Sequence, residues 1–266
     1  MAVFNYNTRF APVAPIQVLE GMLAAGTEVF GDYHLLLAHH TVEHKKRFGD
    51  LFKRATDLGW EGDVIMDNSI VELGDAVSLD MVAEATNVVK DNSPDSYCYP
   101  VLPDVMGKGQ ETRDIIQAEY SNWESGCPGD GFMAVCQGED IEDFQKSLYL
   151  FADQMQFPEI RILGIPRVLY KTCGSRIEAI RHVKDFLGTH LVHLLGFSDN
   201  MDDDLASLSF LGLGGIDSAV PLRVREVFTI HTDAGKRSPT WFEDALVDPL
   251  MLENLATARN IFEIKD

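Results

Sequence analysis

Short apolar runs alternate along this chain with longer amphipathic segments. The runs recur at intervals of roughly 30 residues, the length of one strand–helix–strand unit. Apolar stretches bounded by glycine, proline or aspartate are typical of strands that are buried on both faces of a parallel sheet. The sequence predicts such strands at residues 32–40, 63–67, 96–104, 131–138, 159–168, 190–198 and 213–221.

The segments between these runs have the spacing of amphipathic helices. Asp140 is a predicted N-cap, because its side chain can accept a hydrogen bond from the backbone N–H of Asp143. Gly59 is a predicted helix stop. We expect helices over residues 15–26, 42–59, 79–89, 109–126, 140–155, 175–188, 201–212 and 248–264.

This alternation predicts an α/β protein, and its period favours a (β/α)8 TIM barrel. The 266 residues fit one large domain better than two small ones. The remaining strand is the least regular, and residues 225–231 are its best candidate. We therefore predict a single domain over residues 1–266, with an N-terminal extension at 1–30 and the last βα unit and C-terminal helix at 225–266.

The composition narrows the class of protein. The chain is 45% hydrophobic and 24% charged, as in an ordinary globular enzyme. No apolar run reaches the roughly 18 residues that span a bilayer, and the first residues lack a secretory apolar region. We expect a soluble cytoplasmic protein with no membrane partner. The formal charge of −20 disfavours nonspecific binding to a phosphate backbone, although it permits a local basic groove.

Four cysteines are present, and none forms a CxxC pair. Cys98 and Cys136 lie inside apolar runs, which indicates core thiols in a reducing compartment. No cysteine and histidine cluster has the spacing of a zinc site. We therefore expect no metal and no organic cofactor.

Several of the predicted strands end in polar residues that can do chemistry: Asp67, Asp104, Gln137 and Asp217. Because the C-terminal strand ends of a barrel converge on one mouth, these side chains are candidate active-site residues. His193 lies in the middle of an apolar run and is interpreted as a core histidine.

Residues 193–223 resemble the tRNA-guanine transglycosylase superfamily, which uses a (β/α)8 barrel to exchange guanine for a 7-deazaguanine. The stretch reads HLLGFSDNMDDDLASLSFLGLGGIDSAVPLR and is similar to the family's strand–glycine segment, short helix and G-[IV]-D block followed by P-x-R. The resemblance places Asp217 on the nucleophilic aspartate, four residues before Pro221.

Four other positions extend the resemblance. Asp67, in MDNS, resembles the aspartate that opens the family's DSGGFQ motif, and Asp104 resembles its base-recognition aspartate. Gln137 and Gly138 resemble the start of its QGG motif, and Gly164, in ILGIP, resembles a glycine of its GGLAVGE segment. The match covers most of the barrel, about residues 60–225 in a domain of this kind.

The chain also departs from the family. After Asp67 the sequence reads Asn68-Ser69-Ile70-Val71-Glu72, without the paired glycines of the family's motif. No cysteine follows Cys173, so the family's C-terminal zinc subdomain of three cysteines and a histidine is absent. That subdomain helps the tRNA enzymes to hold RNA. The chain therefore resembles most closely the zinc-free, phage-type 7-deazaguanine DNA transglycosylases.

The chemistry of base exchange fits these residues. It passes through an oxocarbenium-like sugar, for which two carboxylates are suited. The resemblance implies that Asp217 attacks the sugar and that Asp67 moves protons. Asp104 would accept the N1–H and amine of guanine, and Gln137, with Gly138 and Gly164, would bind its O6 edge.

The sequence thus predicts an enzyme that exchanges guanine for a free 7-deazaguanine base in DNA, encoded by a phage and working in the host cytoplasm. Arg223 and Arg225 are candidates for binding the nucleic-acid backbone. Because the base must leave the helical stack, we expect single-stranded DNA or a partner protein. The alternatives are a tRNA-guanine transglycosylase, a noncatalytic base-binding subunit and a small-molecule nucleoside ribosyltransferase.

Overall fold

Parallel strands close into a barrel in the computed structural model, which describes residues 8–181, 190–211, 214–232 and 245–263. The strands are β1 (Thr8–Pro12), β2 (Tyr33–Leu37), β3 (Asp63–Asp67), β4 (Tyr97–Pro100), β5 (Phe132–Val135), β6 (Ile160–Pro166), β7 (Leu191–Leu195) and β8 (Gly214–Ser218). They pair in the orders β1-β8-β7-β6-β5 and β2-β3-β4. Single bridges from Val13 to Leu35 and from Val101 to Met133 join the two sheets into one ring.

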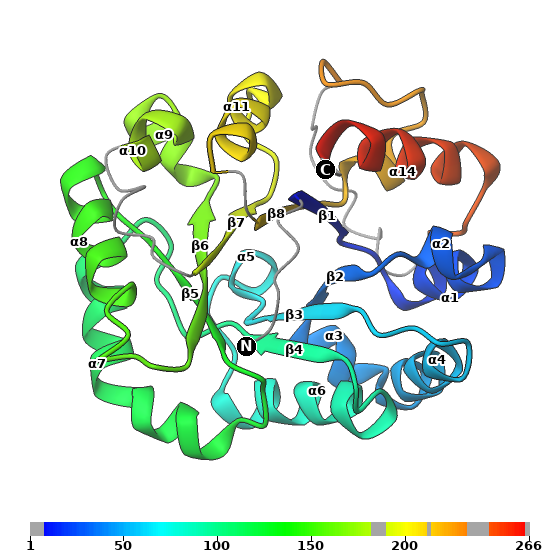
Figure 1. Ribbon diagram of the computed structural model, residues 1–266, viewed down its shortest axis with the longest axis horizontal. Coiled ribbons are helices and arrows are strands. Elements are labelled where there is room, and N and C mark those ends of the chain that lie inside the picture. Colours follow the sequence, from blue (N-terminus) through cyan, green and yellow to red (C-terminus); the bar gives the residue numbers. More distant parts are fainter. Residues whose placement is uncertain (1–7, 182–189, 212–213, 233–244, 264–266) are drawn as a thin grey trace.

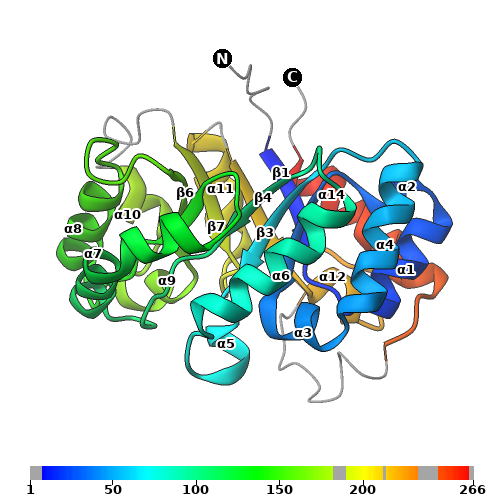
Figure 2. The same cartoon turned by 90° about the horizontal axis from the view of Figure 1, so that it is seen from below.

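Helices surround this ring (Figure 1). They are α1 (Ile16–Ala25), α2 (Thr27–Phe30), α3 (Ala38–Glu43), α4 (Lys45–Asp57), α5 (Ile70–Leu73), α6 (Leu79–Asn92), α7 (Gly109–Gly126), α8 (Ile141–Phe151), α9 (Val168–Cys173), α10 (Arg176–Arg181), α11 (Met201–Leu211), α12 (Val220–Arg223) and α14 (Pro249–Phe262). The short helices α3 and α5 directly follow β2 and β3, and Figure 2 shows both on the lower side of the molecule. That side therefore carries the C-terminal strand ends.

Alternating residues of the strands build two buried layers. One set fills the barrel interior and includes Leu35, Ile65, Val135 and Ile162. The other set packs against the surrounding helices and forms the larger core cluster. Because both faces of each strand are buried, the strands read as nearly continuous apolar runs. This is the physical basis of the pattern seen in the sequence.

The predicted single-domain TIM barrel is confirmed. The strand at residues 63–67 has the predicted bounds, and the helix expected at 79–89 continues to Asn92. Asp140 caps α8 as predicted, with its side chain accepting a hydrogen bond from the backbone N–H of Asp143 at 2.8 Å. Of the helix predicted at 175–188, residues 182–188 lie outside the described part of the chain.

Two predictions about the ends of the chain are wrong. Residues 1–30 are not a mere extension, because Thr8–Pro12 is the barrel strand β1 and pairs with β8. Residues 225–231 form no strand. Their backbone groups are bound by a side chain instead: Asn254 of α14 accepts from the N–H of Phe228 and donates to the carbonyl of Glu226, both at 2.8 Å.

Two further findings concern predictions from composition. Cys98 and Cys136 are fully buried, and burial raises the pKa of both thiols, which confirms them as core residues. Within the described ranges, the helices are too short or too polar to cross a membrane.

Candidate active site

Three carboxylates from distant parts of the sequence gather at the C-terminal ends of the strands. Asp67 is the last residue of β3, Asp104 follows β4, and Asp217 lies near the end of β8. Burial raises the pKa of Asp67 well above its usual range, and repulsion from Glu72, Asp104 and Asp217 adds to the shift. The charges of Asp104 and Asp217 thus contribute to the raised pKa of Asp67. That the three aspartates act in one site stays a prediction.

Asp217 is held through one of its two oxygens. His193 Nε2 lies 3.0 Å from Asp217 Oδ1, and the backbone N–H of Gly196 donates to the same oxygen at 2.9 Å. Among the described residues, Oδ2 has no hydrogen-bond partner. The side chain keeps 10% of its surface exposed. Oδ2 is thus the oxygen of Asp217 that no described neighbour holds.

Asp104 is held through both oxygens. Asn68 donates its amide to Oδ1 at 2.7 Å, and Gln137 donates its amide to Oδ2 at 2.6 Å. Burial raises the pKa of Asp104, and these two amide hydrogen bonds counteract the shift. Each oxygen keeps a second lone pair, so the carboxylate remains an acceptor with a fixed orientation.

The two amides are themselves locked. Asn68 accepts a hydrogen bond from the backbone N–H of Ile70 at 3.2 Å, and Gln137 accepts one from that of Gly107 at 2.9 Å. Their NH2 groups must therefore point at Asp104. Gln137, predicted to meet the O6 edge of a base, has one amide proton committed to this carboxylate.

Asp67 lies beside a strained backbone turn. The backbone N–H of Ser69 donates to Asp67 Oδ2 at 2.9 Å. Ser69 has φ of 63°, in the left-handed region. Among the described residues, every other one with a positive φ is a glycine. A left-handed conformation costs a non-glycine residue about 1–2 kcal/mol.

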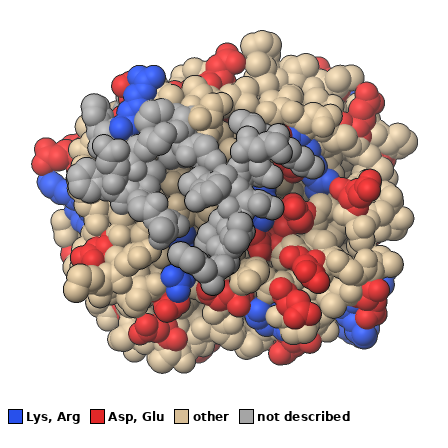
Figure 3. All heavy atoms as spheres, viewed as in Figure 1, with Lys and Arg blue, Asp and Glu red and all other residues tan. Residues whose placement is uncertain are grey.

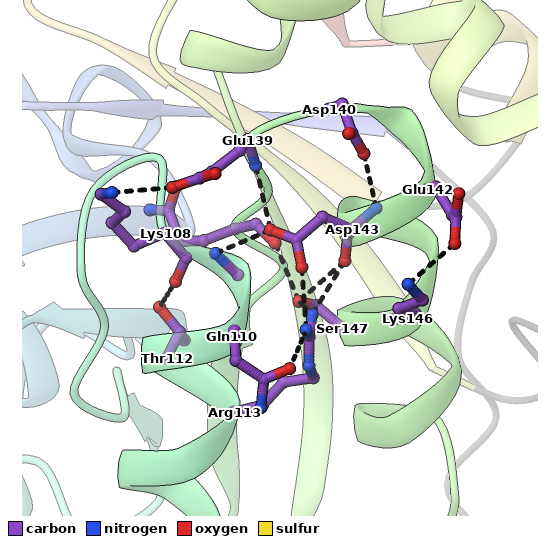
Figure 4. Close-up of polar contacts among 12 residues, drawn as sticks. Lys108, Gln110, Thr112, Arg113, Glu139, Asp140, Glu142, Asp143, Lys146 and Ser147 are labelled. Atoms are coloured by element: carbon purple, nitrogen blue, oxygen red, sulfur yellow. Dashed lines mark hydrogen bonds and ion pairs between the residues drawn. The ribbon is translucent and has the colours of Figure 1, made fainter.

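A polar network fixes the segment that carries Gln137 (Figure 4). Arg113 of α7 donates to the Asp143 carboxylate and to Ser147 Oγ of α8, each at 2.8 Å. Ser147 Oγ in turn donates to the backbone carbonyl of Gln137 at 2.8 Å. Asp143 also accepts from the backbone N–H of Glu139 at 3.0 Å. The network joins α7, α8 and the loop between β5 and α8.

A buried ion pair fixes the loop that carries Gly196. Arg176 and Asp204 lie 3.1 Å apart with both side chains fully buried. Arg176 also donates to the carbonyl of Gly196 at 2.8 Å, while Asp204 accepts from the backbone N–H of Ser198 at 2.8 Å. The loop after β7 is thus held with the N–H of Gly196 directed at Asp217.

Packing requires a glycine at one of the two predicted base-binding positions. A Cβ on Gly138 would lie 2.4 Å from the backbone nitrogen of Phe144, so α8 can approach this loop only over a glycine. Gly164 lies within β6 and pairs with Val135 and His193. Neither observation tests base binding, which stays a prediction for both.

The two predicted arginines follow β8. Arg223 ends α12 and is partly buried, whereas Arg225 is exposed just beyond it. A cavity of about 500 Å³ opens beside Asp104, and Ile70, Pro103 and Met106 are among its lining residues. This volume is within the range of roughly 300–1,000 Å³ for small-molecule sites. Asp67 and Asp217 do not line it.

One group of possible metal ligands occurs in the described part of the chain. The ligand atoms of His40, Glu43 and His44 all lie within 4.8 Å of one another. However, His40 Nε2 accepts a long hydrogen bond from the backbone N–H of Ile16, which places its proton on Nδ1. A histidine bound to metal donates from its second nitrogen, so this arrangement does not have the usual hydrogen bonding of a metal site.

Sequence reasoning missed three residues of the site: Tyr33, Asn68 and His193. Asn68 could have been found as the neighbour of Asp67, and His193 as the first residue of the resembling stretch. Tyr33 left no local signal, because it reaches His193 across 160 positions of sequence. His193 is buried as predicted, yet it contacts the candidate nucleophile.

No family model and no curated protein matches this chain. Among solved structures, it is similar to a dihydrodipicolinate synthase family protein from Coccidioides immitis, with a TM-score of 0.53 and 10% identity over 84% of this chain and 70% of that one. It is also similar to β-methylaspartase from Clostridium tetanomorphum, with a TM-score of 0.50 and 10% identity over 96% of this chain and 59% of that one.

A third match is deoxyribose phosphate aldolase from Aeropyrum pernix, with a TM-score of 0.49 and 13% identity over 79% of this chain and 86% of that one. All three matched proteins are named as enzymes or members of enzyme families. For the first two matches, with TM-scores of 0.53 and 0.50, the likeness shows the TIM-barrel fold alone, because one barrel supports many chemistries. None of the three proteins is named as a base-exchanging enzyme.

Proposed function

We propose that this protein is a guanine transglycosylase-like enzyme, which exchanges guanine for a 7-deazaguanine base in DNA through a covalent Asp217–sugar intermediate. The observation that carries the proposal is the meeting of three buried or half-buried carboxylates, with one Asp217 oxygen unoccupied among the described residues. A mouth with a free carboxylate oxygen and a second, proton-carrying carboxyl suits displacement at a sugar carbon.

The exchange takes two displacements. Asp217 Oδ2 attacks C1′ as the bond from C1′ to guanine breaks, and the departing guanine takes a proton from Asp67. The incoming 7-deazaguanine then attacks C1′ through its ring nitrogen, returns a proton to Asp67 and releases Asp217. The raised pKa of Asp67 supports this role, because a carboxyl that keeps its proton nearer neutral pH is a better acid.

Asp104 is the proposed acceptor for the two donors on guanine. Its orientation is fixed by Asn68 and Gln137. It also lines the cavity of about 500 Å³, which Leu79 of α6 and Trp123 of α7 line as well. Adenine presents no matching pair of donors, so it would form no such pair of hydrogen bonds with Asp104. Gly138 and Gly164 are proposed to complete the base site with their backbone groups.

DNA is the proposed polymer, in line with the resemblance of residues 60–225 to the phage-type DNA transglycosylases. Arg223 and Arg225 follow β8 and could bind a phosphate of the reacting strand. Acidic side chains are more widespread than basic ones on the face shown in Figure 3, which favours a local contact over a broad basic surface.

The test is incorporation of a labelled base. Purified protein is incubated with radiolabelled guanine and, separately, with single-stranded DNA, duplex DNA, tRNA or free nucleosides. We expect label in DNA and a denaturation-resistant protein–DNA adduct when the second base is withheld. Asp217→Asn should abolish both. Asp95→Asn, an exposed aspartate that precedes β4 at the opposite end of the barrel, is the matched control.

Each rival has its own outcome. Label in tRNA alone would make the protein a tRNA enzyme, and turnover of free nucleosides without polymer would make it a small-molecule ribosyltransferase. Base binding with no exchange and no adduct would identify a noncatalytic subunit. An Asp217→Asn variant with unchanged exchange would remove the proposed nucleophile.

A further inference from the structure

A chain of buried hydrogen bonds leads from the barrel interior to Asp217. Tyr33 begins β2, and its hydroxyl oxygen lies 2.7 Å from His193 Nδ1. The other ring nitrogen, His193 Nε2, lies 3.0 Å from Asp217 Oδ1. Tyr33 is 3% exposed and His193 is fully buried, so water does not compete for these bonds.

The chemistry of the three groups fixes the direction of the chain. Burial raises the pKa of the Tyr33 hydroxyl, so that group keeps its proton and can donate. An ionised Asp217 can only accept, and therefore His193 Nε2 must donate to it. A neutral imidazole has one N–H, which leaves Nδ1 as the acceptor for Tyr33. All three groups are then satisfied without a buried imidazolium.

A glycine makes room for this contact. Gly215 lies two residues before Asp217 on the same face of β8. A Cβ at Gly215 would come within 2.5 Å of Tyr33 Cε1 and 3.0 Å of His193 Nδ1. Any side chain there would therefore push the two rings apart. The Arg9 guanidinium lies over the Tyr33 ring, 4.2 Å from the ring centroid.

We propose that Tyr33 and His193 are positioning residues for Asp217: Tyr33 fixes the Nε2–H tautomer of His193, which holds Oδ1 and presents Oδ2 for attack. The proposal rests on the proposed function, in which Asp217 is the nucleophile. Both donors to Asp217 bind Oδ1, so attack through Oδ2 breaks no existing hydrogen bond. Holding a nucleophile in a reactive orientation lowers the entropic part of the barrier.

The first measurement is independent of activity. Nitrogen-15 NMR of the full-length protein labelled at histidine reports which ring nitrogen of His193 carries the proton. We expect Nε2–H with an unprotonated Nδ1 in the wild type, and a mixture of tautomers in Tyr33→Phe. An Nδ1–H tautomer or an imidazolium in the wild type at neutral pH would overturn the proposal.

The second measurement is steady-state base exchange. Tyr33→Phe should lower kcat about tenfold while the KM for the base stays within twofold, because only the orientation of Asp217 changes. His193→Met, which keeps the volume but loses the donor, should lower kcat by about 10²-fold. His193→Gln should recover most of the rate, since its amide can donate to Oδ1. Tyr99→Phe, another buried tyrosine of the barrel interior, is the matched control.

The outcomes separate the two proposals. If wild-type protein shows the predicted tautomer but no base exchange with any substrate, the proposed function fails while the hydrogen-bond chain stands. If exchange occurs and both Tyr33→Phe and His193→Met keep full kcat, the positioning role is wrong. A parallel fall in kcat, base affinity and melting temperature, with no recovery in His193→Gln, would indicate a purely structural role and would also overturn the proposal.

Discussion

Asp217 and Asp104 differ in how many of their carboxylate oxygens are hydrogen-bonded by neighbouring residues. Asp217 is bound on one oxygen by an imidazole and a backbone N–H, and its other oxygen is unoccupied among the described residues. Asp104 is bound on both oxygens by side-chain amides. The first arrangement suits a group that forms a bond, and the second suits a group that keeps its place and accepts hydrogen bonds.

The ion pairs that support the two carboxylates also differ, in how far each is buried. Behind Asp217, the fully buried Arg176–Asp204 pair fixes the loop after β7. Behind Asp104, the partly exposed Arg113–Asp143 pair fixes the loop that carries Gln137. The same mouth therefore contains two carboxylates of one residue type whose chemistry is set by which neighbours reach them.

The sharpest test of this contrast removes each carboxylate's charge. Asp217→Asn should lower kcat by on the order of 10³-fold or more, since a carboxamide is a poor nucleophile. Asp104→Asn should instead weaken binding of the base by about 10²-fold, the loss of two charge-assisted hydrogen bonds at roughly 1.5 kcal/mol each. Single-turnover kinetics and base-binding titration distinguish the two effects. If both variants lowered kcat and base affinity by the same factors, the proposed difference in role between Asp217 and Asp104 would be wrong.

The supports should differ in their contribution to stability. Arg176→Met leaves the Asp204 carboxylate buried without a partner and should cost about 3–5 kcal/mol of unfolding free energy. Arg113→Met should cost less, about 1–2 kcal/mol, because water can reach the Asp143 side chain, which is 18% exposed. Urea unfolding monitored by circular dichroism measures both. The reverse order would show that the Arg176 pair is not the main support.

The amide donors to Asp104 should matter most when that group is ionised. Asn68→Ala should lower the free energy of unfolding by about 1–3 kcal/mol at neutral pH. Burial already raises the pKa of Asp104, and losing an amide raises it further, so the folded state binds its proton more tightly. Stability then falls as pH rises above the unfolded-state pKa of about 4, and the deficit shrinks in acid. Asn92→Ala is the matched control. It loses a side-chain amide hydrogen bond to the carbonyl of Val88, which does not titrate, and so should show no such pH dependence.

The smallest expected effect is at Ser69, which follows Asn68, the amide donor to Asp104. Ser69→Gly should stabilise the fold by up to about 1 kcal/mol, because glycine adopts the left-handed backbone without strain. Ser78→Gly is the matched control: Ser78 caps α6 with φ of −64°, so the change should cost a few tenths of a kcal/mol. Thermal unfolding measures both. A destabilised Ser69→Gly would mean that the Ser69 side chain contributes more than its strain costs.

The elements with strong local patterns could be predicted from sequence. Strand β3 has the predicted bounds, and α8 is capped by Asp140 as predicted. The end of the barrel could not be predicted in this way. The segment at 225–231 looks apolar enough for a strand, but Asn254 binds its backbone, and the short segment Thr8–Pro12 takes the place beside β8. Which segment fills that place depends on contacts between the two ends of the chain.

The same division holds for the site. The sequence alone determined that Asp67, Asp104, Gln137 and Asp217 stand at or near strand ends, because the period of apolar residues sets where each strand stops. Only the tertiary structure decided which oxygens of Asp104 and Asp217 are bound. Their donors come from other strands and loops, and a hydrogen bond between residues far apart in sequence leaves no pattern in either local segment. Barrel closure brings Tyr33, His193 and Asp217 into contact. The surroundings of Asp217 therefore differ from those of Asp104, although the two side chains are identical.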